Sequence, residues 1–531
     1  MKTTAEFSQL PRKTWRDRVG LQVVFSILFV MLLRLPSLGW AVISDDEAIY
    51  DAMAQVINSG GVMYRDALDH KPPGLAYVYA AVERLVGAHS AGMLGIQAVH
   101  AFGILLTALT VFGLFALARE LLKRELWWVP AVLYGIVSST RCAYDGLALN
   151  GEILMNTPTV FAVLAVIWAG KSKGGRRVLL DLSAGALMGL AGLAKWQALV
   201  AGLAFPFLGF DNSTYLKRIF QRGPFWLIGL LTPVVGAALY FKSHGVLTEF
   251  LQWGGLFNLR YISEGPDLIW ALKRLATQLA AVVLPSIVFY AAASYGLFAT
   301  IRKGWARGPE RYAVNAGLFI WAIVSILSVA IGGRFFGHYF LQAELPLCLI
   351  AAGPLYRAWM RAPKTIGAAI AIPALFFFAI SLKPEATHAI FDAGEPDWER
   401  VGQAISRQSK PDDTLFVWGN VPELYHYSQR KMGTRFSFCN YLTGLSPGTR
   451  SEYDPSYQPA QVSEAWPLLL QDLQNRRPSI IVDTASAGWK SYAKFGISRY
   501  PEFQAFLKAH YRAIDRTPAS LGGATLYRRI D

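Results

Sequence analysis

Long apolar stretches separated by short polar segments dominate the first 382 residues. The first stretch, 20–43, is long enough to cross a hydrocarbon core of about 30 Å. Further apolar stretches follow at 92–118, 126–141, 153–169, 179–194, 197–211, 224–242, 276–300, 313–333, 338–356 and 365–382. The pattern predicts an α-helical polytopic membrane module in residues 1–382, with about 11 transmembrane helices.

Basic residues fall before the first stretch and in every second loop after it. They are Lys2, Arg12, Lys13, Arg16 and Arg18; Arg119, Lys123 and Arg124; Lys171, Lys173, Arg176 and Arg177; Lys217, Arg218 and Arg222; Arg302, Lys303, Arg307 and Arg311; and Arg357, Arg361 and Lys364. The positive-inside rule therefore predicts a cytoplasmic N-terminus, and an odd number of spans leaves the C-terminus outside. The first stretch is too long for a signal peptide and lacks a small-x-small cleavage site, so we expect a retained anchor.

Two polar regions lie outside this helical pattern. The first outer loop, 44–90, is predicted to hold two short helices, one beginning near Asp45 and one near Pro73. Residues 383–531 contain strand-like runs at 414–418 and 479–483, which alternate with helical patterns at 398–408, 465–475 and 501–510. We expect this second region to be a C-terminal extracytoplasmic, and thus periplasmic, α/β domain.

Composition agrees with a membrane protein. The chain has 531 residues, of which 53% are hydrophobic and only 16% charged, and soluble chains carry roughly 25% charged residues. The net charge of +15 would suggest nucleic-acid binding in a soluble protein. Here the cytoplasmic loops account for it, so no nucleic-acid partner is expected. Cys142, Cys348 and Cys439 lie far apart and indicate neither a disulfide framework nor a zinc site.

The chemistry-bearing residues concentrate in the first outer loop. Asp45, Asp46 and Glu47 follow Ser44 directly beside the membrane, and Asp69-His70-Lys71 follows about twenty residues later. Ser44 with Glu47 matches a capping box, and acids favour a helix N-terminus. Capping alone does not explain why a second acid, a histidine and a lysine lie in the same loop.

Here the sequence resembles a family. Arg34-Leu35-Pro36, then Asp46-Glu47 with Tyr50, then Lys71-Pro72-Pro73-Gly74 resemble membrane glycosyltransferases of the GT-C fold. Within that fold the pattern is most similar to the branch with the protein O-mannosyltransferases and the lipid A aminoarabinose transferase, the family 39-like enzymes. The resemblance extends through Asn150-Gly151-Glu152, Lys195 and the run 334–339 ahead of Pro346, and covers roughly residues 20–382.

The resemblance implies transfer of a sugar, with inversion, from a polyprenyl-phosphate donor to a hydroxyl acceptor on the outer face of the inner membrane. The acceptor would be lipid A, an envelope glycan or a protein. Asp46 would be the base that takes the hydroxyl proton, Glu47 would support it, and Lys71 would contact the donor phosphate. This chemistry is coherent, because a single displacement needs a base on the attacking side and a phosphate leaving group needs cations.

Other residues have both a site role and a structural alternative. Lys195 and Arg334 are candidate donor-phosphate ligands, but either could anchor a helix end at the interface. The candidate substrate-binding residues are Tyr50, Glu152, Arg260, Tyr261, His338 and Tyr339. Glu152 could equally be a solvated loop carboxylate. Loop placement is the basis for Arg260 and Tyr261, which could close over the site.

A metal is a further candidate ligand. The resemblance implies an acid before the motif lysine, where this chain has His70. Relatives can hold a metal near the donor phosphate, so His70 with His338 are candidate ligands of a divalent ion. Packing or hydrogen bonding is the alternative for both histidines, and nothing in the sequence requires a cofactor.

Two other functional classes compete with the glycosyltransferase. A transporter of a lipid or small solute would use many spans with charges inside the membrane. However, the acids cluster in an outer loop, and no repeated halves or paired broken helices are evident. A scaffold that presents the C-terminal domain would leave the acidic loop without a role.

Overall fold

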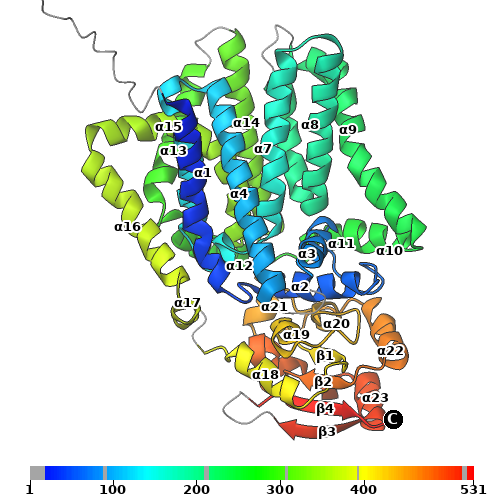
Figure 1. Cartoon of the computed structure of the whole chain (residues 1–531). Helices are drawn as coiled ribbons and strands as arrows, with labels where there is room; N and C mark the ends of the chain where they lie inside the picture. The colour runs from blue at the N-terminus through cyan, green and yellow to red at the C-terminus, as the bar shows by residue number, and fades with distance from the viewer. Residues whose placement is uncertain (1–17, 88–92, 209–213, 305–308, 392–393, 517–522) are drawn as a thin grey trace, which may run out of the picture.

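The computed structural model describes residues 18–87, 93–208, 214–304, 309–391, 394–516 and 523–531. A helical bundle occupies one end of the molecule and a small sheet with its helices occupies the other (Figure 1). The first polar loop lies between these two parts (Figure 1). The basic residues Lys2 to Arg16 and Arg307, which entered the orientation argument, lie outside the described residues.

Six described helices are long and apolar enough to cross a membrane. They are α1 with its 3₁₀ extension η2 (Val19–Arg34, Leu35–Gly39), α4 (Met93–Leu121), α6 with α7 (Ala143–Gly146, Gly151–Gly170), α8 (Gly174–Ala194), α9 (Tyr215–Ser243) and α16 (Pro363–Ser381). A seventh span results if α12 with η6 (Leu268–Gln278, Leu279–Val283) is joined to α13 (Ile287–Gly304) across a bend of 106°. The predicted number of about eleven spans therefore stays a prediction.

The other predicted stretches are also helical, but they are not among these six spans. They form α5 (Val129–Ser139), the 3₁₀ helix η4 (Trp196–Phe207), α14 (Pro309–Ala330) and α15 (Phe340–Arg361). A 3₁₀ helix rises about 2.0 Å per residue, so η4 is longer than an α-helix of equal residue count. The 3₁₀ helix η4 contains Pro206, whereas α15 is one continuous α-helix although it contains Pro346 and Pro354.

The bundle exposes large apolar side chains on its surface, as helices that face lipid do. Leu28 on α1, Leu239 on α9 and Ile372 on α16 are each more than half exposed. Short elements connect the long helices: η3 (Arg124–Leu126), α10 (Leu247–Glu249), the π-helix η5 (Phe250–Leu256), α11 (Phe257–Ser263), η7 (Gly337–Tyr339) and α17 (Pro384–Phe391).

The first outer loop forms the two short helices that the sequence predicts. They are α2 (Asp45–Asn58) and α3 (Gly74–Leu85). The N-terminus of α2 is fixed by Ser44, whose hydroxyl accepts a hydrogen bond from the Glu47 N–H at 3.3 Å. The helix α3 starts directly after Pro72-Pro73, as expected of a residue pair that cannot continue a preceding helix.

The C-terminal region contains a four-stranded mixed sheet in the order β1-β2-β4-β3. The strands are β1 (Leu415–Trp418), β2 (Ile480–Asp483), β3 (Tyr511–Arg516) and β4 (Thr525–Arg529). Strands β1 and β2 pair in parallel, and the other two pairings are antiparallel. The predicted strands at 414–418 and 479–483 are thus confirmed.

Helices surround this sheet (Figure 1). They are α18 (Trp398–Arg407), α19 (Glu423–Ser428), α20 (Asn440–Thr443), α21 (Arg450–Tyr453), α22 (Ala465–Asn475), η8 (Trp489–Phe495), η9 (Ile497–Arg499) and α23 (Pro501–His510). The predicted helices at 398–408, 465–475 and 501–510 correspond to α18, α22 and α23. The division of the chain into domains at residue 382 remains a prediction.

One hydrophobic core joins the first outer loop to the C-terminal region. Met53 of α2 and Tyr79 of α3 belong to the same buried cluster as Trp418 of β1 and Phe436. Trp253 of η5 belongs to it as well. The outer loop is therefore packed on both sides, by the bundle and by the sheet region, and its helices have a fixed position.

Candidate active site

Glu47 anchors the first turn of α2. Its carboxylate accepts hydrogen bonds from the N–H groups of Ile43 at 2.9 Å and Leu149 at 2.8 Å. His100 of α4 lies 3.1 Å from the same carboxylate. The predicted capping box is therefore only half formed, because this carboxylate binds Ile43 and not the Ser44 N–H. Glu47 is 1% exposed and ties α2 to the bundle.

Asp46, one residue earlier, has a different environment. Its side chain is 37% exposed, and its Oδ1 lies 2.8 Å from Nζ of Lys71, which is 29% exposed. Burial alone would raise the pKa of Asp46, but the charge and the hydrogen bond of Lys71 outweigh it, and the pKa lies below its ordinary value. Asp46 is therefore an ionised, solvent-accessible carboxylate with a cation beside it.

Lys71 is held by a second carboxylate and an aromatic ring. Asp69 lies 3.7 Å from its Nζ, and the ring centroid of Tyr50 lies 5.1 Å from it. Burial lowers the pKa of Lys71, but Asp46 and Asp69 raise it more, so it lies well above the ordinary value. Tyr50, predicted to bind substrate, is 3% exposed and makes a cation–π contact with Lys71.

Asp69 is positioned by the C-terminal region. Its Oδ1 accepts hydrogen bonds from the His70 N–H at 2.7 Å and from the Tyr441 hydroxyl at 3.2 Å. The Tyr441 hydroxyl also lies 3.0 Å from the His70 backbone nitrogen and 2.8 Å from His70 Nδ1. Tyr441 of α20 thus contacts the loop that presents Lys71, although 370 residues separate Tyr441 from Lys71 in the sequence.

A second ion pair lies near the first. Lys195, at the end of α8, pairs with Glu152 in the first turn of α7. The Lys195 Nζ also lies 3.8 Å from the ring centroid of Tyr339. A Cβ at Gly74, three residues after Lys71, would lie 2.6 Å from the carbonyl oxygen of Leu193, two residues before Lys195. The structure therefore brings these predicted residues, which come from separate elements, into one electrostatic cluster.

Lys71 and Lys195 each pair with a carboxylate, whereas Arg334 donates its hydrogen bonds to neutral groups. It donates to the Tyr261 carbonyl at 3.1 Å and to the Ser446 hydroxyl at 2.9 Å. Its Nε has no hydrogen-bond partner among the described residues. The ring of Tyr261 lies 3.6 Å from the guanidinium carbon, and Arg334 is 1% exposed. Tyr261 thus covers a buried positive charge at the edge of the site.

His338 pairs with Asp145, a residue that was not among the predicted site residues. The Oδ1 of Asp145 lies 3.0 Å from His338 Nδ1 and accepts the His338 N–H at 2.9 Å. This arrangement requires a glycine at position 337, because a Cβ there would lie 2.2 Å from Asp145 Oδ2. The close approach explains the Gly337-His338 pair in the run 334–339.

The hydrogen-bond and ion-pair partners of Arg260 differ from those of the cluster. Its guanidinium pairs with Glu264 at 2.6 Å and reaches the Gln461 carbonyl at 3.3 Å. Glu464 lies 3.7 Å away. The structure thus connects Arg260 to the C-terminal region, and its predicted substrate contact stays a prediction. Its neighbour Tyr261 stacks on His70 with ring centroids 4.3 Å apart.

The candidate metal ligands are not gathered around a common point. Within the described ranges, no group of three or more His, Cys, Asp or Glu side chains could hold a metal ion. His70 contacts Tyr441 and Tyr261, and His338 contacts Asp145, so each imidazole has another partner. The residues present do not fit a metal centre.

Sequence reasoning missed Tyr441, Ser446 and the partnership of Asp145. Tyr441 and Ser446 belong to the C-terminal region, whose sequence shows no site motif. Asp145 lies 193 residues before His338. No local pattern could reveal these contacts, because they depend on how distant segments pack.

Solved structures provide the comparison with known proteins. ArnT from Cupriavidus metallidurans, bound to undecaprenyl phosphate, matches with a TM-score of 0.59 and 13% identity, over 97% of this chain and 99% of that chain. The archaeal oligosaccharyltransferase AglB from Archaeoglobus fulgidus, in complex with an inhibitory peptide and a dolichol-phosphate, matches with a TM-score of 0.55 and 14% identity. That match covers 98% of this chain and 75% of AglB.

The A. fulgidus oligosaccharyltransferase in complex with Zn and sulfate matches with a TM-score of 0.52 and 16% identity, over 96% of this chain and 73% of that chain. No protein-family model and no curated protein matches the sequence. The similarity therefore lies in the arrangement of the elements. It extends over almost the whole chain, including the C-terminal region, and the chain has the GT-C fold of membrane glycosyltransferases that the first-loop pattern predicted.

Proposed function

We propose that the protein is an inverting glycosyltransferase that uses a polyprenyl-phosphate sugar and a hydroxyl acceptor at the outer face of the inner membrane. The observation that carries the proposal is the Asp46–Lys71 pair, with its carboxylate and ammonium 2.8 Å apart and both side chains partly exposed. The structures of ArnT with undecaprenyl phosphate and AglB with a dolichol-phosphate support this donor class.

In the proposed reaction the acceptor oxygen attacks the anomeric carbon while the bond from that carbon to the phosphate oxygen breaks. The polyprenyl phosphate leaves with the electron pair, and Asp46 takes the proton of the acceptor hydroxyl. Lys71 stabilises the charge that develops on the phosphate. Glu47, held by two N–H groups and His100, keeps the first turn of α2 in place and is a positioning residue.

The ion pair also gives a way to activate the base. With Lys71 beside it, Asp46 has a lowered pKa and is a weak base. When the donor phosphate pairs with the ammonium of Lys71, the Asp46 carboxylate loses its stabilising partner, while Asp69 and the partial burial of Asp46 remain. The pKa of Asp46 then rises. Donor binding therefore makes Asp46 a stronger base for removing the proton of the acceptor hydroxyl.

The two other cations complete the donor site in this proposal. Arg334 has only neutral hydrogen-bond partners, so a phosphate would supply the negative charge that it lacks. Tyr261 covers its guanidinium and has to move before a phosphate can reach it. Lys195, held by Glu152, lies on the Tyr339 side of the site.

The cellular arrangement follows from the same proposal. Residues 1–382 would form the catalytic membrane module, with its catalytic loop at 44–90. Residues 383–531 would form a periplasmic domain that packs on this loop. The N-terminus would lie in the cytoplasm, and lipid A, an envelope glycan or a protein would be the acceptor. No step uses a metal, since no ligand cluster fits one among the described residues.

Transfer of labelled sugar from a polyprenyl-phosphate donor to an envelope extract tests the proposal. Asp46→Asn should reduce transfer by about 10²- to 10⁴-fold, the usual contribution of a general base. Glu464→Gln, which neutralises an exposed carboxylate outside the cluster, should retain transfer. Normal transfer by Asp46→Asn would refute the base. Uptake of labelled solute or lipid into vesicles without sugar transfer would support a transporter instead.

A further inference from the structure

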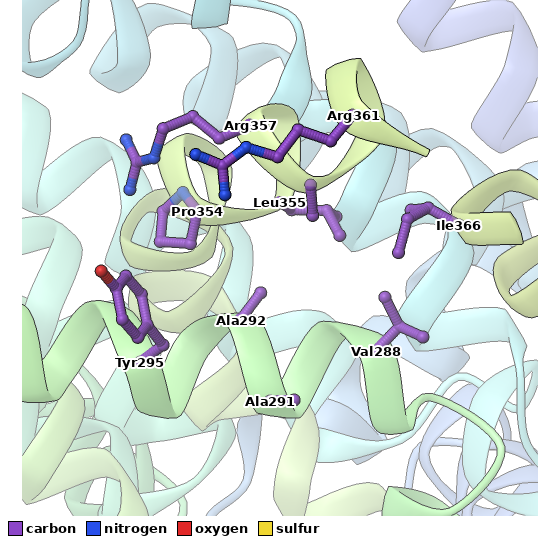
Figure 2. A pocket seen from close by; sticks show the side chains of 10 residues that line it. Val288, Ala291, Ala292, Tyr295, Pro354, Leu355, Arg357, Arg361 and Ile366 are labelled. Carbon is purple, nitrogen blue, oxygen red and sulfur yellow. The ribbon is translucent and has the colours of Figure 1, made fainter. Parts of the chain in front are cut away.

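A cavity of about 490 Å³ lies among three helices of the bundle, α13, α15 and α16. Val288 and Ala292 line it from α13, Leu355 from α15, and Ile366 from α16. Figure 2 shows these side chains facing one another across the space, with the small Ala291 on the α13 side. The walls are apolar, and the volume falls within the range of about 300–1,000 Å³ that is usual for ligand sites.

Two arginines border this apolar space. Arg357 and Arg361 lie one turn apart in the last two turns of α15, and both side chains extend along the same edge of the cavity (Figure 2). Both residues are exposed, and neither pairs with a carboxylate in the part of the chain that the structure describes. The site therefore combines a hydrophobic slot with two positive charges that lack a counter-ion.

The cavity lies at the far end of α15 from the candidate active site. The helix starts at Phe340, directly after the His338–Tyr339 segment, and Arg357 follows 17 residues later. At 1.5 Å per residue this separation is about 26 Å, close to the thickness of a hydrocarbon core. If Asp46 lies at one face of the membrane, the two arginines lie at the other face, where lipid headgroups are found.

We propose that this cavity binds one anionic glycerophospholipid, with its phosphate between the guanidinium groups of Arg357 and Arg361 and one acyl chain in the apolar slot. Guanidinium forks match phosphate oxygens in geometry and charge. Basic pockets between transmembrane helices are a recurring setting for anionic lipid headgroups. This site is separate from the proposed donor site, and it requires no assumption about the reaction.

Native mass spectrometry of the full chain, delipidated and then titrated with phosphatidylglycerol or phosphatidylcholine, tests the site. Arg357→Gln with Arg361→Gln should weaken phosphatidylglycerol retention about 10- to 30-fold, as expected for the loss of two basic groups near a lipid phosphate. The matched control is Arg302→Gln with Lys364→Gln. It removes the same charge from exposed positions that do not line the cavity.

A third variant tests the slot without changing the charge. Ala291→Phe adds a ring on an exposed part of α13 that lines the cavity, and should weaken retention of phosphatidylglycerol. If the arginine pair and the control pair lose phosphatidylglycerol retention equally, the arginines act only as general surface charge and the proposal is overturned. Equal retention by Ala291→Phe and the unmodified chain would show that no acyl chain enters the slot, and would overturn it as well. If inorganic phosphate displaces phosphatidylglycerol and binds with the same affinity as the lipid, the site is a free-anion site and the proposal is overturned.

Discussion

Two ion pairs of this protein have similar geometry and opposite environments. Asp181 of α8 binds Arg222 of α9 at 2.7 Å and also accepts a hydrogen bond from Trp226, and both charged side chains are at most 3% exposed. Asp46 and Lys71 are 2.8 Å apart, but 37% and 29% of their side-chain surfaces are exposed. The Asp181–Arg222 pair is shielded from solvent and is called the closed pair. The Asp46–Lys71 pair is partly exposed on both side chains and is called the open pair.

The difference indicates what each pair can do. A buried pair with several hydrogen bonds cannot exchange its partner without a large desolvation penalty, so it fixes the packing of α8 against α9. A partly exposed pair costs little to separate, and either charge can take a new partner from solvent or from a ligand. The Asp46–Lys71 pair is therefore suited to chemistry and the Asp181–Arg222 pair to structure.

The largest expected effect comes from breaking the closed pair. Arg222→Met leaves Asp181 buried without its cation and should lower the free energy of unfolding by about 3–5 kcal/mol. Lys71→Met should lower it by less than about 1 kcal/mol, since the pair it breaks is partly solvated. Thermal unfolding in detergent measures both. Asp181→Asn combined with Arg222→Met should recover part of the loss, and no recovery would mean that packing, not charge, dominates there.

The next effect concerns activity at the open pair. Lys71→Met should lower kcat/KM for the donor about 10²-fold, because in our proposal this cation stabilises the charge on the leaving phosphate. Arg260→Met is the matched control, since the sequence suggested a substrate contact for Arg260 but the structure connects it to Glu264 and Gln461. It should change kcat/KM less than about threefold. Equal losses in the two variants would contradict the distinction between the cluster and its surroundings.

The pH dependence of the open pair provides a third test. Lys71 holds the pKa of Asp46 below its ordinary value, so the unmodified protein should lose activity only at pH values below the usual carboxylate range. In Lys71→Met this cation is gone while burial and Asp69 still raise the pKa. Asp46 should then protonate at higher pH, and the acid limb of kcat/KM should move upward. An unchanged limb in that variant would show that another group controls the profile.

The comparison also explains how much the sequence could predict. The helices α2 and α3 and the role of Ser44 were predictable, since an N-cap, acids in a first turn and a Pro-Pro pair are local signals. The cluster of Asp46 with Lys71 was predictable from topology and resemblance. Long-range pairs such as Asp181 with Arg222 were not, because both residues read as ordinary charges at the ends of spans.

The same reasoning applies to residues whose partners differ from what the local sequence suggests. Arg260 and Tyr261 are adjacent in the sequence, and both were placed at the site by their loop alone. Tyr261 covers Arg334, whereas Arg260 pairs with Glu264 and lies near Glu464, since successive residues of α11 point in different directions. The half-formed capping box has a similar cause, because Glu47 finds better partners in the tertiary structure than the local Ser44 N–H.

The smallest expected effect tests whether the C-terminal region acts on the open pair. The Tyr441 hydroxyl lies 3.2 Å from Asp69 and 3.0 Å from the His70 nitrogen, so Tyr441→Phe removes contacts that hold the Lys71 loop. One hydrogen bond contributes about 1 kcal/mol, which corresponds to a loss in kcat/KM of roughly fivefold. The loss should appear mainly in the KM for the donor, since Lys71 binds the phosphate in our proposal.

Tyr492→Phe is the control for this variant. Tyr492 is also fully buried in the C-terminal region, and its hydroxyl contacts Asn440 and Thr443 instead of the outer loop. Both variants should lose similar thermal stability, but only Tyr441→Phe should lose transfer activity. If the two variants lose activity in proportion to stability, the C-terminal region supports the fold in general and does not position Lys71. Loss of donor affinity in Tyr441→Phe alone would instead link residues of the sheet region directly to the exposed ion pair.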